Sequence, residues 1–210
     1  MRRIPDKIRT ALPVAMLLLL SCSSSLTDRV KAYEASHNSH DVEGTLAFFA
    51  EDFRYEMVGS WVAEGREQMR KFEEWDASIG SELIFDNYDV SGDTVTCTVI
   101  ERNDWFSLVG VDAIYYECVR IIFKDGLITE ITAEQSHESM LATQTAFQAF
   151  IEWAVEEHPQ RLAALMSGAK FEFSKETADK WLSLLKEWRQ QLRQFDRITR
   201  RIADRKSSVV

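Results

Sequence analysis

Two glutamates in neighbouring segments of alternating hydrophobicity have a spacing that suits acid–base chemistry. Glu101 continues the apolar positions of residues 94–106 at intervals of two, and Glu117 is predicted to do the same in residues 113–123. A hairpin centred near Val109 places the two residues roughly opposite each other on an apolar face. Two carboxyl groups in such surroundings can share a proton, which raises one pKa and suits general acid–base catalysis.

Each of these acids also has a simple structural interpretation. In that interpretation Arg102 or Arg120 pairs with one glutamate, and the other glutamate lies at the solvated rim of the sheet. Apolar residues could form a pocket around the acids. The alternative is that they simply pack in the core, as residues of these types most often do. The candidate ligand-binding residues are Tyr33, Tyr55, Met57, Trp61, Phe72, Trp105, Val119 and Ile131.

Metal and cofactor chemistry find little support in the sequence. His37, His40 and Asp41 lie close together, but three residues in one turn without a distant fourth ligand favour a solvated loop over a metal site. The chain has no C-x-x-C or H-x-x-x-H spacing, nucleophile elbow, phosphate-binding loop or dinucleotide-binding fingerprint. We therefore expect no metal and no cofactor.

Two cysteines, Cys97 and Cys118, lie in neighbouring predicted strands. Their alternation with the surrounding apolar residues places the two sulfur atoms on opposite faces of the sheet. A disulfide cannot join opposite faces without a change of register. The expectation is therefore two free and mostly buried thiols.

The first residues have the pattern of a secretory signal. Residues 1–9 carry four basic side chains, residues 11–20 are almost wholly apolar, and Cys22 follows at once. The residues L-L-S-C that end at Cys22 resemble the lipobox of bacterial lipoproteins, in which the signal is cut before a cysteine that then carries lipid. The alternative is a plain signal peptide in which Cys22 is incidental.

The lipobox resemblance implies a location in the cell. Residues 1–21 are then the signal, and residues 22–25 are the lipidated cysteine and a short tether. One acyl chain holds a protein on a membrane only marginally, whereas two or three chains on one cysteine make the attachment stable. We expect an exported protein anchored to the bacterial cell envelope by lipid on Cys22, on the outer membrane facing the periplasm if the host has one.

The charge of the chain argues against nucleic acid as a partner. The 210 residues carry a net charge of −9, and removing residues 1–21, with four basic and one acidic side chain, lowers it to −12. So acidic a chain repels a phosphate backbone. The charge is uneven, because residues 185–210 carry +5 and residues 22–184 carry −17. The basic segment is interpreted as a solvated helix face, with contact to anionic lipid as the alternative.

The hydrophobic pattern predicts an α+β fold. Helical segments and one short strand come first, and four segments of period two follow as an antiparallel meander. The helices are predicted at residues 26–37 and 41–50 and from residue 65, the short strand at 53–58, and the meander at 83–90, 94–106, 113–123 and 127–135. Thr27 or Asp28 is the expected cap of the first helix.

Residues 137–210 are predicted to form a helical extension. A helix at residues 143–157 and a short one near 162–166 precede a long helix that Ser174 caps. The apolar seam of the long helix alternates by four and three and is interrupted once, by a threonine; its positions are Trp181, Leu185, Trp188, Leu192, Phe195, Thr199 and Ile202. Packing on the chain's own surface is the favoured interpretation, and a homodimer is the alternative.

Several short motifs follow one another in a characteristic order over residues 26–136. They are Asp41-Val42-Glu43, Phe49-Ala50-Glu51-Asp52-Phe53, Gly65-Arg66-Glu67-Gln68-Met69 with Phe72, and Gly126-Leu127-Ile128. In this order they resemble the nuclear transport factor 2-like superfamily, within it the SnoaL-like and ketosteroid isomerase-like branch. The resemblance implies a strongly curved sheet wrapped around helices as a cone, whose apolar interior binds or transforms small hydrophobic molecules. It also implies that chains can pair through the outer face of the sheet.

The reacting residues of ketosteroid isomerases do not all carry over to this chain. Those enzymes use a tyrosine on the first helix, a base aspartate at the end of the first strand and a protonated aspartate on a later strand. Tyr33 matches the tyrosine, but the base falls on Met57 and the second acid near Val119, and neither can transfer a proton. An enzyme of this kind would have to use Glu117 or Glu101 with Tyr33.

Two functions are compatible with the sequence. The first is a membrane-tethered protein of the cell envelope whose cone binds a small hydrophobic molecule or a protein partner, without catalysis. The alternative is a SnoaL-like isomerase, cyclase or hydrolase that acts on a hydrophobic molecule by carboxylate and tyrosine acid–base chemistry. The 74 residues of the extension favour the first, because they predict a covered or partly filled cavity.

Overall fold

The computed structural model describes residues 25–166 and 171–207. The predicted signal, Cys22 and the next two residues of the predicted tether lie outside this part of the chain. Among the helices of the described residues, none is long and apolar enough to cross a membrane.

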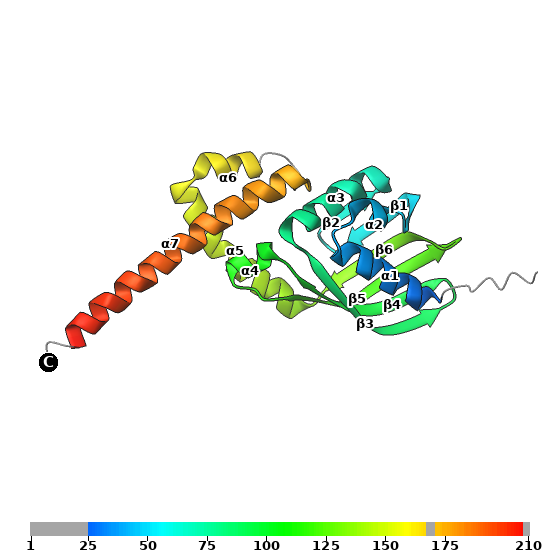
Figure 1. Ribbon diagram of the computed structural model, residues 1–210, viewed down its shortest axis with the longest axis horizontal. Coiled ribbons are helices and arrows are strands. Elements are labelled where there is room, and N and C mark those ends of the chain that lie inside the picture. Colours follow the sequence, from blue (N-terminus) through cyan, green and yellow to red (C-terminus); the bar gives the residue numbers. More distant parts are fainter. Residues whose placement is uncertain (1–24, 167–170, 208–210) are drawn as a thin grey trace, which may run out of the picture.

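A curved sheet of six strands forms the body of the molecule (Figure 1). The strands are β1 (Phe49–Met57), β2 (Trp61–Glu64), β3 (Glu82–Ser91), β4 (Thr94–Arg102), β5 (Ile114–Lys124) and β6 (Leu127–Gln135). Their order across the sheet is β2-β1-β6-β5-β4-β3, with β1 parallel to β6 and the other neighbours antiparallel. The fold class is α+β, as predicted, but β1 and β2 extend the predicted antiparallel meander into a mixed sheet.

One strand ends earlier than its pattern indicates. The alternation predicts a strand over residues 94–106, whereas β4 ends at Arg102. The Asn103 side chain then accepts a hydrogen bond from the Phe106 backbone N–H at 2.8 Å and begins the short helix α4 (Asp104–Val109). Helix α4 therefore stands where a continuous hairpin was expected.

Three helices pack against one face of the sheet: α1 (Leu26–Asn38), α2 (Val42–Leu46) and α3 (Gly65–Ile79). Ser25 begins α1 with a capping box. Its hydroxyl accepts a hydrogen bond from the Asp28 backbone N–H, and its own N–H donates to the Asp28 carboxylate. The predicted caps Thr27 and Asp28 are inside the helix, because Ser25, assigned to the tether, takes the capping position.

Bulges curve the sheet and change which side chains face inward. The register between β4 and β5 shifts between Cys97 and Val99, and that between β5 and β6 shifts between Tyr116 and Cys118. An extra residue bends a strand and moves the following side chains to the other face. The buried side chains of β5 are therefore Ile114 and Tyr116 before the bulge, and Val119, Ile121 and Phe123 after it.

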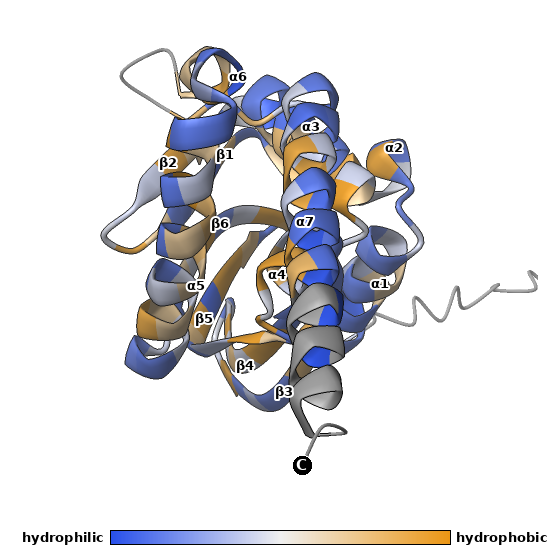
Figure 2. Ribbon diagram, turned by 90° about the vertical axis from the view of Figure 1, so that its left-hand side faces the viewer, coloured by the Kyte–Doolittle hydropathy of each residue, from blue (hydrophilic) through white to orange (hydrophobic). Residues whose placement is uncertain are grey.

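The C-terminal extension consists of α5 (His137–Glu157), α6 (Pro159–Leu165) and α7 (Lys175–Ser207). The hydroxyl of Ser174 accepts a hydrogen bond from the Thr177 backbone N–H at 3.2 Å, which confirms the predicted cap of the long helix. Figure 1 shows α5 and α7 at one end of the sheet, and Figure 2 shows both hydrophilic and hydrophobic residues along the coloured part of α7.

A second hydrophobic core joins this extension to the rest of the chain. Trp75 and Ile79 at the end of α3 and Val109 of α4 belong to it, together with residues of α5 and α6. Helix α7 contributes Ala178, Trp181, Leu182, Leu184, Leu185 and Trp188. The predicted intramolecular packing of the extension is therefore present in the structure.

The apolar seam of α7 divides into a packed and an exposed part. Trp181, Leu185 and Trp188 are buried, whereas Leu192 and Phe195 are 37% and 60% exposed. Beyond them α7 projects past the body of the molecule (Figure 1). The side chains at the last two predicted seam positions, 199 and 202, lie outside the described part.

The two cysteines in the sheet have different surroundings. Cys97 is buried and Cys118 is exposed, and no disulfide joins them. The prediction of opposite faces agrees with this placement, but the expectation that both thiols are mostly buried is wrong for Cys118. It lies at the bulge of β5, where two successive side chains face outward. Burial raises the pKa of the Cys97 thiol to about 12.

Candidate functional site

Two adjoining cavities lie between the sheet, α3 and the extension. The inner cavity has a volume of about 40 Å³ and the outer one about 310 Å³. Phe72, Asp76, Glu101 and Tyr116 line both cavities, so these four residues mark their junction. We refer to the two spaces together as the interior cavity.

All eight candidate ligand-binding residues line the interior cavity. The inner part is lined by Tyr33, Tyr55, Phe72, Val119 and Ile131, and the outer part by Met57, Trp61, Phe72 and Trp105. The extension adds Phe171 and Phe173, which are not among the predicted ligand-binding residues. The cavity is therefore shared between the predicted cone and the residues that follow it.

Three donors converge on the carboxylate of Glu101. The Tyr116 hydroxyl donates to Oε2 at 2.6 Å, and the Asn103 side-chain amide donates to Oε1 at 2.6 Å. The Ser81 hydroxyl donates to Oε1 at 3.2 Å. Hydrogen bonds to both oxygens hold the side chain in place and stabilise a negatively charged carboxylate.

Asn103 connects this network to the local fold. Its carbonyl oxygen begins α4, as described above, while its amide nitrogen donates to Glu101. The side chain is buried, with 7% of its surface exposed. The early end of β4 therefore places a rigid donor beside the glutamate, which a longer strand could not do.

The carboxyl group of Asp76 faces the junction of the two cavities from α3. Only 6% of the residue is exposed, and among the described residues none forms a hydrogen bond or ion pair with its carboxyl group. Burial raises the pKa of Asp76 well above its usual value, and the negative charges of Glu101 and Glu73 raise it further. The site therefore combines a hydrogen-bonded carboxylate with a buried carboxyl group whose pKa is raised.

Three tyrosines complete the polar lining. Tyr33, Tyr55 and Tyr116 are in the interior, where burial is the main cause of raised pKa values. The next cause is the negative charge of Glu73 for Tyr33 and of Glu101 for the other two. All three phenols therefore keep their protons at neutral pH and can donate hydrogen bonds.

A buried histidine and glutamate lie behind the cavity. His37 Nδ1 is 3.0 Å from Glu73 Oε2, and the two side chains are 2% and 3% exposed. The remaining atoms, His37 Nε2 and Glu73 Oε1, have no partner among the described residues. This pair joins α1 to α3 beside Tyr33. The centroids of the Tyr33 and His37 rings are 6.2 Å apart.

The predicted solvated loop of His37, His40 and Asp41 is wrong for His37, which is buried in the last turn of α1. His40 Nε2 lies 3.1 Å from the Ser81 carbonyl oxygen, and Asp41 caps α2 by accepting a hydrogen bond from the Gly44 N–H. Each residue thus has a separate structural task. Among the described residues, no three His, Cys, Asp or Glu side chains are grouped as a metal site.

Glu117 does not lie in the interior cavity. It is exposed, and the residue opposite Glu101 is Ile114. The predicted pairing of Glu101 with Glu117 is wrong because the bulge in β5 reverses the alternation between Tyr116 and Val119. Glu101 itself does face the interior. The Arg120 alternative also fails, since Arg120 pairs with Glu130 at 3.1 Å.

Asp76 was missed although the sequence contains a signal for it. In the predicted third helix, Met69, Phe72 and Ile79 fall at helical spacing on one apolar stripe. Asp76 follows Phe72 by four and precedes Ile79 by three, so it lies on the same stripe. A carboxylate on the buried face of an amphipathic helix is a candidate for function.

Comparisons with known proteins give no match to a family model and none to a curated protein. Solved structures do match. An NTF2-like protein of unknown function from Cytophaga hutchinsonii is 11% identical over 58% of this chain and 99% of its own, with a TM-score of 0.48. The epoxide hydrolase/cyclase-like enzyme SalBIII of salinomycin pyran-ring formation is 16% identical over 54% and 92%, with a TM-score of 0.49.

An LEH-like epoxide hydrolase of M. tuberculosis is 18% identical over 60% of this chain and 93% of its own, with a TM-score of 0.47. At these identities the likeness concerns the fold alone, so the chemistry of the site must come from the residues of this chain.

Replacing Asp76 by asparagine tests the buried carboxyl group. A raised folded-state pKa means that Asp76 stabilises the fold at low pH and loses this contribution as the pH rises from 3.8 through the raised value. We expect Asp76→Asn to be more stable than the natural protein above neutral pH, by on the order of 1–3 kcal/mol. This advantage should shrink toward pH 4. Urea unfolding of both proteins across this range measures it, and a constant difference would contradict the assignment.

Proposed function

We propose that the protein binds a small, mostly apolar molecule in the interior cavity, with a polar group of that molecule at Asp76 and Glu101. One observation carries the proposal: a cavity of about 310 Å³ with an aromatic wall is lined by a buried carboxyl group that has no hydrogen-bond partner among the described residues. Cavities of this size, mainly apolar with a few convergent polar groups, are typical small-molecule sites.

The position of the extension favours a small molecule over a protein partner. Phe171 and Phe173 contribute to the wall of the cavity, and their rings contact Trp75 at centroid distances of 5.1 and 5.6 Å. A protein segment would have to displace these packed rings. A small molecule could occupy the space that they leave.

Dye binding tests this proposal. N-phenyl-1-naphthylamine is uncharged and fluoresces strongly in apolar surroundings, so we expect saturable binding to the folded protein. Ser60 is an exposed residue at the rim of the outer cavity. Ser60→Trp should fill the entrance and weaken dye binding at least tenfold. Ser107→Trp, at an exposed position on α4, is the matched control and should bind as the natural protein does. Equal binding by both variants, or no binding at all, would refute the proposal.

Acid–base catalysis is a second candidate function, and the two unlike carboxyl groups favour it. Burial raises the pKa of Asp76, while three donors hold the Glu101 carboxylate, so one group could accept a proton and the other donate one. The three protonated tyrosines could stabilise a developing oxyanion. The alternative set of Glu117 with Tyr33 is not supported, since Glu117 is exposed on the other face of the sheet.

A model reaction tests whether the cavity offers a base. 5-Nitrobenzisoxazole opens in one step when a base removes its C–H proton, and the product absorbs visible light. A desolvated carboxylate should accelerate this reaction on the order of 100-fold over acetate at equal concentration. The rate should rise with pH as Asp76 ionises and fall in Asp76→Asn, but not in Asp112→Asn. A rate equal to that of acetate would exclude an accessible base.

We further propose that the protein is exported and held at the cell envelope by lipid on Cys22. The order of basic residues, apolar run and cysteine in the sequence supports this location. In bacterial cells the natural protein should sediment with membranes, whereas Cys22→Ser should lose the lipid mass and leave the membrane fraction. A Cys22→Ser protein that remains in that fraction would contradict lipid anchoring. A homodimer through α7 has less support, since the seam is packed within the chain up to Trp188.

A further inference from the structure

The interior cavity has an uneven charge. Among the described residues that line it are two carboxyl groups, those of Asp76 and Glu101, and no lysine, arginine or histidine. A third acid, Glu73, lies behind the wall and is paired with His37, the only basic side chain among the buried residues of the described chain. The described lining residues therefore offer a ligand acidic groups and no basic side chain.

Asp76 is the part of this cluster that lacks a partner. Glu101 has three donors, and Glu73 has His37, but the carboxyl group of Asp76 faces the cavity with no hydrogen bond to the described residues. A buried polar group without a partner is costly unless a ligand supplies one. Burial and neighbouring negative charge raise the pKa of Asp76, and a positive group in the cavity would remove this penalty.

Aromatic rings also line the cavity. Trp61 lies with its ring centroid 4.8 Å from those of both Phe72 and Phe173, and Phe72 and Phe173 are 5.1 Å apart. Trp75 and Trp105 continue the wall at 5.5 Å from each other. Aromatic faces attract cations, and tryptophan does so most strongly. An apolar molecule of any charge could pack on these rings, but a cation gains from the rings and from the acids together.

We propose that the ligand of the interior cavity is a small organic cation, a protonated amine or a quaternary ammonium compound. Its nitrogen would lie at Asp76 and Glu101, and its apolar part would lie against Trp61, Phe72 and Phe173. This inference rests on the small-molecule function proposed above and specifies the chemical class of the ligand. A carboxylic acid would be repelled, and a neutral alcohol could use the acids only as hydrogen-bond acceptors.

Competition against N-phenyl-1-naphthylamine tests the charge preference. Benzylammonium, benzyl alcohol and benzoate share one ring and differ in charge, so they isolate the effect of the polar group. We expect benzylammonium to displace the dye at a concentration at least tenfold lower than benzyl alcohol at pH 7, and benzoate to displace it least. Asp76→Asn should reduce the preference for the amine over the alcohol at least fivefold. Its folding is checked by thermal unfolding.

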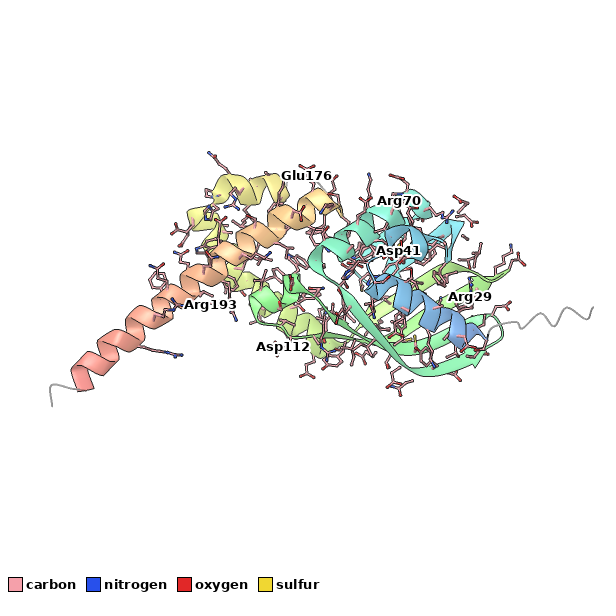
Figure 3. The ribbon with its side chains drawn as sticks, viewed as in Figure 1. Arg29, Asp41, Arg70, Asp112, Glu176 and Arg193 are labelled. Atoms are coloured by element: carbon pink, nitrogen blue, oxygen red, sulfur yellow. The ribbon has the colours of Figure 1, made fainter. Side chains whose placement is uncertain are left out.

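Asp112→Asn is the matched control, because this aspartate is exposed (Figure 3) and is not one of the residues that line the interior cavity. It should retain the full preference. If the dye binds but alcohol or benzoate competes as well as the amine, the cation proposal fails and the small-molecule function stands. If the preference for the amine is the same in Asp76→Asn, the proposed position of the nitrogen is wrong. If the folded protein does not bind the dye, both proposals fail.

Discussion

The bulge in β5 is the constraint on which the interior of this protein depends. Without it, the strand would alternate regularly and Glu117 would share a face with Val119. With it, Tyr116 and Val119 both face inward, and the two residues between them face outward. The same irregularity, matched by a shift in register with β4, bends the sheet around the cavity. One extra residue thus gives curvature and also places the phenol that donates to Glu101.

Helix α3 carries acids where an amphipathic helix should carry apolar residues. Glu73 and Asp76 are 3% and 6% exposed, so the fold desolvates two carboxyl groups on one helix. Such burial opposes folding unless each group is paired or protonated. His37 pairs with Glu73, and the raised pKa of Asp76 favours its protonated form. Local rules that are broken in this way are characteristic of functional sites rather than of cores.

Much of the fold could be predicted because period and turn chemistry are local properties. The helices at the start of the chain, the hairpins and the cap at Ser174 follow from residues close in sequence. The eight predicted ligand-binding residues could be found in the same way, since they are large apolar side chains of those elements. The parallel pairing of β1 with β6 was not predicted, because a contact between strands that are far apart in sequence leaves no local signal.

The site was predicted less well, for a related reason. Glu101 was placed correctly because β4 keeps its alternation from Val95 onward, whereas Glu117 was misplaced because a bulge has no reliable signature in sequence. Asp76 could have been found from the stripe of α3. Phe171 and Phe173 could not, since only the tertiary packing of α7 brings residues after the extension's first helices back to the cavity.

This return of the chain makes the extension part of the site. Trp75, Ile79 and Val109 belong to the sheet-bearing part of the chain, yet they are buried against α7 rather than against the sheet. Without the extension these side chains would face water, at a cost of about 1.5–3 kcal/mol for each large apolar group. The cavity would also lose Phe171 and Phe173 from its wall. The acids that line the cavity come from α3 and β4, whereas part of its shape comes from the extension, so the cavity is formed by both parts of the chain.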